Sequence, residues 1–179
     1  MCNWELTFSG RIVNVEERAN ARGEIRERVV TRDACAIIAL RGEGDDDEEL
    51  LLVKQYRDPV DAYLWELPAG RVDSGETAFD CARRELAEET GYSAKDWEYL
   101  GGFYSSPGFA SEFIYVFLAT DLEMADDPPQ GDEADLTMKW VLRNAINVVD
   151  AKTLASLYLL HRHRTGGDRG FDQSNSQGL

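Results

Sequence analysis

The alternation of apolar and polar residues predicts a chain built mainly from short strands. Residues 8–15 and 24–31 alternate in this way and flank a turn-forming stretch at 20–23, so they predict an N-terminal hairpin. Continuous apolar runs follow at 34–40 and 50–56. Both have the length of a short strand that is buried on its two faces.

Residues 77–90 have the pattern of a helix whose two ends are marked. Thr77 predicts the N-cap, with Asp80 at the capping-box position, and Gly91 provides the C-terminal stop. A second helix is expected over residues 150–162. The first helix should bury a stripe of Phe79, Ala82 and Leu86, and the second carries Leu154, Leu157, Tyr158 and His161 at helical spacing.

Shorter apolar segments complete the order of elements. Strands are predicted at 64–67, 97–104, 112–118 and 136–142, with an acidic loop at 126–135 before the last strand. Strands outnumber helices and the order is mixed, which favours an α+β fold, with an α/β/α sandwich around a mixed sheet as the natural layering. We expect residues 1–33 to form the hairpin element, 34–164 the main domain and 165–179 a polar tail.

Composition narrows the function classes. The chain has 179 residues, and 34 acidic residues against 19 basic ones give a formal net charge of −15. Proteins that bind nucleic acid present basic surfaces to the phosphates, so a nucleic-acid partner is not expected. No signal peptide is evident and no apolar run approaches the ~20 residues of a membrane span. The three cysteines, Cys2, Cys35 and Cys81, suggest neither disulfides nor a zinc site. A soluble cytoplasmic protein is the resulting expectation.

Three glutamates are close together on the first predicted helix. Glu85 is three residues from Glu88 and four from Glu89, which places the three carboxylates on one helical face, where they repel one another. Mg²⁺, which prefers oxygen ligands, would relieve that repulsion, and Arg84 could orient a neighbouring carboxylate. Taken alone, the same pattern also fits a solvated acidic face. The five acids at 45–49 lack ligand spacing and are interpreted as a solvated loop.

The stretch from Gly70 to Tyr92 resembles the Nudix signature. A Gly is followed after five residues by a Glu and after seven more by Arg-Glu-apolar-any-Glu-Glu-any-Gly-apolar, and the one departure is Tyr92, where an aliphatic residue is usual. The resemblance implies the Nudix α/β/α sandwich and a Mg²⁺ cofactor, with Mn²⁺ as the alternative. It implies metal ligation by Glu85, Glu88, Glu89 and the carbonyl of Ala69. It also implies a scaffold of Gly70, Glu76, Arg84 and Gly91, in which Glu76 and Arg84 form a salt bridge.

The flanking segments narrow the resemblance to ADP-ribose pyrophosphatases, over roughly residues 8–163. The segments 53–60 and 64–70, a proline fifteen residues after the signature, and 150–153 are similar to that subfamily. The resemblance implies substrate binding by Arg57, Glu66, Pro107 and Gly108. For Arg57 the alternative is a surface ion pair with Asp58 or Asp61, and for Glu66 it is a carboxylate that merely closes a strand.

The implied reaction is hydrolysis of a diphosphate bond, which needs a residue to accept a proton from water. In the subfamily this residue lies on a loop outside the signature, here 130–135. Glu133 is the first candidate, Asp135 the second, and Glu88 of the signature is a further candidate catalytic residue. The expected products from ADP-ribose are AMP and ribose 5-phosphate.

Other functions remain open at this point. GDP-mannose or another nucleotide sugar is the main rival substrate, a nucleoside triphosphate is less favoured because of Pro107, and a Nudix-like sensor would bind ADP-ribose without cleaving it. The resemblance also implies a homodimer in which the N-terminal hairpin packs on, or exchanges with, the partner.

Overall fold

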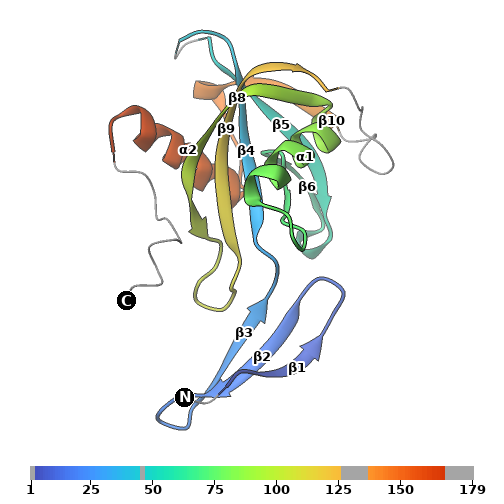
Figure 1. The fold of residues 1–179 in the computed structure, drawn as a ribbon, viewed down its shortest axis with the longest axis vertical. Helices are drawn as coiled ribbons and strands as arrows, with labels where there is room; N and C mark the ends of the chain where they lie inside the picture. Colours follow the sequence, from blue (N-terminus) through green and yellow to red (C-terminus); the bar gives the residue numbers. More distant parts are fainter. Residues whose placement is uncertain (1–2, 45–46, 126–136, 168–179) are drawn as a thin grey trace.

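A computed structural model describes residues 3–44, 47–125 and 137–167. It contains two sheets and two α-helices, and Figure 1 shows the smaller sheet extending away from the main body. The predicted acidic loop at 126–135, most of the predicted tail and Cys2 lie outside the described residues.

The N-terminal element contains the predicted hairpin and one further strand, which the sequence did not predict. β1 (Glu5–Ser9), β2 (Asn14–Ala19) and β3 (Ile25–Val30) pair antiparallel in that order. The segment predicted as one strand is broken by a turn in which the Gly10 N–H donates to the carbonyl of Val13. The predicted turn at 20–23 is confirmed, because the Asn20 side chain accepts hydrogen bonds from the N–H groups of Arg22 and Glu24.

The main sheet is mixed, as predicted. Its strands are β4 (Ala34–Arg41), β5 (Glu49–Arg57), β6 (Ala62–Glu66), β7 (Ala69–Arg71), β8 (Tyr92–Tyr104), β9 (Phe113–Met124) and β10 (Thr137–Leu142). The strand order is β10-β5-β4-β9-β8, and β6 pairs with β5. The central strand β4 is parallel to β9 and antiparallel to β5 and β7.

Each face of β4 contributes to a different hydrophobic cluster. Ala36, Ile38 and Leu40 pack in the cluster that includes Leu159 and Leu160 of α2 (Ala151–Arg164), whereas Cys35, Ile37 and Ala39 pack with Cys81, Ala82 and Leu86 of α1 (Ala78–Thr90). Because neighbouring residues of a strand point to opposite faces, the two helices cover opposite sides of the sheet. The predicted α/β/α layering is therefore confirmed. Two 3₁₀ turns, η1 (Asp58–Val60) and η3 (Arg143–Ala145), connect elements.

The two described cysteines, Cys35 and Cys81, are buried in the hydrophobic cluster between β4 and α1. Their Sγ atoms are 3.0 Å apart between β4 and α1, and both are free thiols. The hydrogen bond with Cys81, together with burial, raises the pKa of Cys35, so this thiol stays protonated.

Helix α1 begins and ends as its sequence predicts. The Thr77 hydroxyl accepts a hydrogen bond from the Asp80 N–H and donates one to the Asp80 carboxylate. Gly91 takes a left-handed conformation, with φ of +70°, and its N–H donates to the Ala87 carbonyl. The helix therefore has the predicted ends, and Ala82 and Leu86 of the predicted stripe are buried, whereas Phe79 is 40% exposed.

Helix α2 turns a different face to the sheet than the apolar spacing suggested. Leu154 and Tyr158 are 51% and 61% exposed, while the buried residues are Thr153, Ser156, Leu159 and Leu160. This orientation is set by a hydrogen bond. The Thr153 hydroxyl accepts it from the N–H of Leu67, which follows β6, so the face that carries Thr153 and Ser156 turns toward the sheet. The predicted stripe is therefore mostly on the solvent side.

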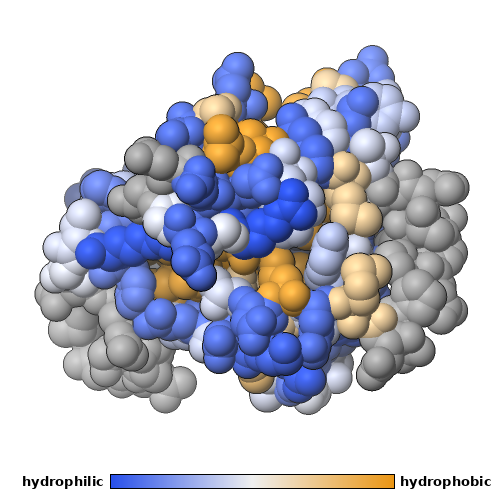
Figure 2. All heavy atoms as spheres, turned by 90° about the horizontal axis from the view of Figure 1, so that it is seen from above, coloured by the Kyte–Doolittle hydropathy of each residue, from blue (hydrophilic) through white to orange (hydrophobic). Residues whose placement is uncertain are grey.

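Neither described helix is long and apolar enough to cross a bilayer. Figure 2 views the molecule from above, toward the end at which β4 and β5 are joined, and shows a largely hydrophilic surface with hydrophobic residues visible in hollows between the polar ones. Among the lining residues of a cavity of about 630 Å³ at this end are Arg41, Tyr92, Asp121 and Trp140, and none of the signature carboxylates is among them.

A substitution on α2 tests its packing. Ser156 is fully buried and its Oγ has no hydrogen-bond partner among the described residues. Because a buried hydroxyl without a partner is costly and Ala favours helix, Ser156→Ala should raise the free energy of unfolding by about 1 kcal/mol. Urea unfolding measures this, with Thr153→Ala as the matched control that should lower stability because its hydroxyl is bonded. A destabilised Ser156→Ala protein would contradict the packing described.

Candidate active site

The signature places a glycine where α1 approaches the backbone of β7. Gly70 pairs with Cys35 of β4, and a Cβ added at Gly70 would lie only 1.7 Å from Oε1 of Glu85. No side chain can therefore occupy this position while the carboxylate of Glu85 remains there. The glycine lets the acidic face of α1 press against the Ala69–Gly70 segment.

Two of the predicted metal ligands are buried at this contact. Glu85 is 8% exposed and Glu89 is 5% exposed. Oε2 of Glu89 accepts a hydrogen bond of 2.9 Å from the Ala69 N–H, and Oε1 accepts one of 2.5 Å from the Gln55 side chain. Burial, with the added effect of the charge of Glu85, raises the pKa of Glu89 to about 7 against the opposing effect of the Ala69 N–H. The pair thus forms a buried negative centre.

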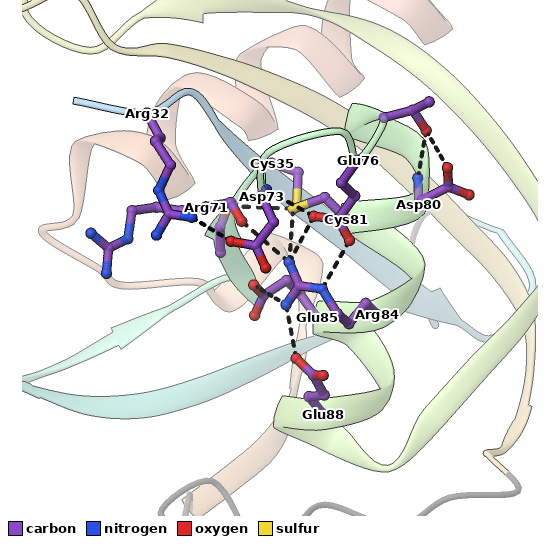
Figure 3. Close-up of polar contacts among 12 residues, drawn as sticks. Arg32, Cys35, Arg71, Asp73, Glu76, Asp80, Cys81, Arg84, Glu85 and Glu88 are labelled. Atoms are coloured by element: carbon purple, nitrogen blue, oxygen red, sulfur yellow. Dashed lines mark hydrogen bonds and ion pairs between the residues drawn. The ribbon is translucent and has the colours of Figure 1, made fainter. Parts of the chain in front are cut away.

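Arg84 is the cation that contacts Glu85 of this centre, and it also binds Glu76 and Glu88. Its Nε and Nη2 bind the two carboxylate oxygens of Glu76 at 2.9 and 3.0 Å, so the predicted Glu76–Arg84 ion pair is present. Arg84 Nη1 donates to Glu85 at 2.7 Å and to Glu88 at 2.8 Å, and Figure 3 shows the guanidinium among the three carboxylates. The hydrogen bond from Arg84, with one from the Asp73 N–H, lowers the pKa of Glu76 to about 2.

The residues present have the chemistry of a site for a hard divalent cation. The groups that could bind a metal are all oxygens. They are three carboxylates on one helix face, with the Ala69 backbone facing them. Within residues 3–44, 47–125 and 137–167, no three acidic, His or Cys side chains already converge on one point. Instead, a single cationic nitrogen of Arg84 is shared by Glu85 and Glu88, so these two carboxylates already flank a positive charge.

None of the signature carboxylates is among the lining residues of two adjoining cavities that open beside the Ala69–Gly70 segment. One, of about 390 Å³, is lined by Gln55, Ala69, Gly70 and Arg71, and the other, of about 400 Å³, by Glu66, Ser105, Ser106 and Asp150 among others. Arg57, Glu112, Ile114 and Lys152 line both, so the cavities adjoin along one wall. Among the lining residues with no predicted role are Gln55, Glu112 and Lys152.

The two predicted substrate-binding residues of the β5–β6 region bind each other. Arg57 donates from Nε and Nη2 to the two oxygens of Glu66 at 2.8 and 2.7 Å. Asp61, an alternative partner for Arg57, accepts a hydrogen bond from the Tyr56 hydroxyl instead. Because Glu66 is 2% exposed and the Arg57 side chain is 41% exposed, the pair anchors a cation at the cavity wall.

The other predicted residues lie farther out. Pro107 and Gly108 are exposed on the loop between β8 and β9 and are absent from the lining of both cavities, whereas Ser105 and Ser106 of the same loop are part of it. Glu133 and Asp135 lie outside the described residues. Their predicted roles are unaffected by this geometry and stay predictions.

Comparisons with known proteins agree with the signature. The family model described as NUDIX domain matches residues 30–162. An ADP-ribose pyrophosphatase of Bacillus subtilis is 36% identical over 154 residues, which cover 83% of this chain and 81% of the relative. An ADP-ribose pyrophosphatase of Mycobacterium tuberculosis is 38% identical over 152 residues, 79% of this chain and 70% of that protein. A crystal structure of an ADP compounds hydrolase has the same fold, with a TM-score of 0.73 at 24% identity, covering 93% and 94% of the two chains.

The raised pKa of Glu89 makes the free energy of unfolding depend on pH. A carboxyl with an ordinary pKa of 4.5 and a folded value of about 7 binds its proton more tightly in the folded protein, so stability falls as the pH rises from 4.5 to 7. In EDTA, Glu89→Gln should therefore be more stable than wild type by about 3 kcal/mol at pH 8 and equally stable near pH 4. Urea unfolding at the two pH values measures this.

The control for this experiment is Glu27→Gln, which removes an exposed carboxylate of β3. It should change stability little at either pH. A Glu89→Gln protein that is less stable than wild type at pH 8 would show that the buried charge is better compensated than the geometry indicates.

Proposed function

This chain belongs to the Nudix family, and we propose that it is a metal-dependent hydrolase that cleaves the diphosphate bond of ADP-ribose to give AMP and ribose 5-phosphate. One observation carries the proposal: the buried carboxylates of Glu85 and Glu89 meet the Ala69–Gly70 backbone at the wall of a cavity that also presents Arg57. Carboxylates that lie behind the Ala69–Gly70 wall of a cavity, with a cation on another part of its lining, suit a diphosphate held through a divalent cation.

The cation would be held by Glu85, Glu88, Glu89 and the carbonyl of Ala69, with Mg²⁺ the preferred ion and Mn²⁺ the alternative. A bound divalent cation supplies a lowered pKa for coordinated water and screening of the phosphoryl oxygens. Arg84, anchored by Glu76, keeps Glu85 and Glu88 side by side. Gly91 ends the helix directly after these ligands, and Gly70 leaves room for them.

The substrate would lie along the two cavities. Arg57, which Glu66 holds in position, would contact the diphosphate or the terminal ribose. The loop that contains Pro107 and Gly108 would contact the part of the substrate farther from the cation. The proton from the attacking water goes to Glu133, with Asp135 and Glu88 as the other candidates. The names of the two pyrophosphatase relatives support ADP-ribose over other nucleotide sugars.

We also propose that the protein acts in the cytoplasm on this small molecule, with no nucleic acid or membrane as partner. The free thiols of Cys35 and Cys81 fit a reducing compartment. The surplus of acidic residues, 34 against 19 basic ones, fits the absence of a polyanionic partner.

Turnover tests the function. With Mg²⁺, the protein should convert ADP-ribose to AMP and ribose 5-phosphate faster than it acts on GDP-mannose, UDP-glucose or ATP. Glu89→Gln should lower kcat by about 100-fold or more, because it removes a carboxylate from the cation site. Chromatographic resolution of the products measures both.

Glu27→Gln is the matched control in the turnover assay and should retain full activity. Glu133→Gln and Asp135→Asn, assayed side by side, identify the proton acceptor by the larger loss of kcat. If GDP-mannose were hydrolysed faster than ADP-ribose, the substrate assignment would be wrong and the hydrolase assignment would stand. If the protein bound ADP-ribose without hydrolysing any substrate, it would be a sensor and not an enzyme.

The exposed apolar residues of the N-terminal sheet point to its partner. Leu6, Phe8, Ile12 and Ile25 are 57–67% exposed on a small sheet that projects from the domain. Several exposed apolar side chains on one small projecting sheet are typical of an interface. We propose a homodimer formed through this sheet.

Light scattering after gel filtration tests the dimer. The wild-type protein should elute as a dimer at micromolar concentration, and Leu6→Glu/Phe8→Glu should shift it to the monomer, because charges would be buried without partners. Tyr158→Glu, at an exposed aromatic of α2, serves as the control and should stay dimeric. A monomeric wild-type protein would contradict the proposal.

A further inference from the structure

The first turn of α2 is tied to the end of β6, directly before the signature. Lys152 Nζ lies 3.1 Å from Oε2 of Glu66 and 3.4 Å from the carbonyl of Leu67. The N–H of Leu67 donates to Thr153 Oγ1 at 3.0 Å. Both backbone polar groups of Leu67 are therefore held by α2, two residues before Ala69.

Lys152 has its donors engaged by the protein. An ammonium group has three N–H donors, and Nζ has Glu66, the Leu67 carbonyl and, at 3.6 Å, Asp150 around it. The side chain is only 14% exposed although it lines both cavities. A lysine in this state acts on a ligand through the groups that it holds.

The group that it holds most closely is the anchor of Arg57. Oε2 of Glu66 accepts from both Arg57 Nη2 and Lys152 Nζ, so one buried oxygen is shared by two cations. Burial alone would raise the pKa of Glu66, but Arg57 and Lys152 together bring it below its ordinary value. Without Lys152, the carboxylate would lose one of the two cations that keep it ionised in a position that is 2% exposed.

We propose that Lys152 is a positioning residue for the diphosphate: by holding ionised Glu66 and the backbone of Leu67, it fixes the Arg57 guanidinium at the cavity wall. This rests on the proposed function, since it assigns Arg57 to a diphosphate-bearing ligand. Lys152 is outside the signature and touches no substrate atom; its effect on binding passes through Glu66 and Arg57.

The experiment combines Lys152→Met, Lys152→Arg and Arg57→Met. Lys152→Met should raise KM for ADP-ribose, and the Kd for ADP measured by calorimetry, about 10-fold, with kcat changed only a few-fold, because a charge-assisted hydrogen bond that orients the binding cation is lost. Lys152→Arg should restore most of the affinity. In the Arg57→Met background, Lys152→Met should add no further loss of ADP affinity, since the cation that it positions is absent.

Two controls separate this role from a general effect on the fold. Lys95→Met removes an exposed lysine that pairs with Asp121 and Glu123 on β9, and should leave KM and Kd unchanged. Thr153→Val removes the hydroxyl bonded to Leu67 without a change of charge, and should lower stability more than it changes ADP affinity. If Lys152→Met does not fold, Glu66→Gln/Lys152→Met leaves no unpaired carboxylate and should bind ADP as weakly as Arg57→Met.

The outcomes are distinguishable. Unchanged ADP affinity in Lys152→Met, or losses that add fully to those of Arg57→Met, would overturn the positioning role while leaving the hydrolase intact. Wild-type protein that binds ADP but does not hydrolyse ADP-ribose would overturn the proposed function, and the affinity series would still decide the role of Lys152.

Discussion

The close approach of α1 to the Ala69–Gly70 segment is the constraint on which the rest of the site depends. It requires a glycine, because a Cβ at Gly70 would lie within the carboxylate of Glu85. It also requires the helix to begin and end where it does, since Thr77 and Gly91 fix the register that turns Glu85 and Glu89 inward. Burial of two carboxylates is costly, so the local sequence is arranged around a charge that only a cation or a proton can offset.

The protein compensates its acidic residues unequally. Glu76, Glu85 and Glu88 all bind Arg84, and Glu66 binds two cations, so each of these carboxylates has a cationic partner in place. Glu89 receives only hydrogen bonds from amides, within the part of the chain that the structure describes, and its pKa is raised to about 7. The site therefore has its least compensated negative charge next to the Ala69 backbone, which is where an added divalent cation would stabilise it most.

Sequence patterns predicted what is encoded locally. The α1 helix with its caps, the buried runs of β4 and β5, and the Glu76–Arg84 pair all follow from residues close together or from the signature. One local feature was missed: a turn at Gly10 divides the first predicted strand. The prediction for α2 failed because a long-range contact decides its orientation. The helix presents Thr153 and Ser156 to the sheet, where the Thr153 hydroxyl binds the N–H of Leu67, 86 residues earlier. Apolar spacing carries no information about such a bond.

The same limit explains why Gln55, Glu112 and Lys152 had no predicted role. Each is an ordinary polar residue in its own segment, and only the sheet and α2 bring them to the two cavities. Their arrangement also resolves an apparent conflict between a net charge of −15 and an anionic substrate. A diphosphate responds to the groups within a few ångströms more than to the screened charge of the whole surface. Arg57 and Lys152, both fixed on Glu66, keep one cavity wall cationic within an acidic protein, so recognition of the substrate rests on fixed local charge.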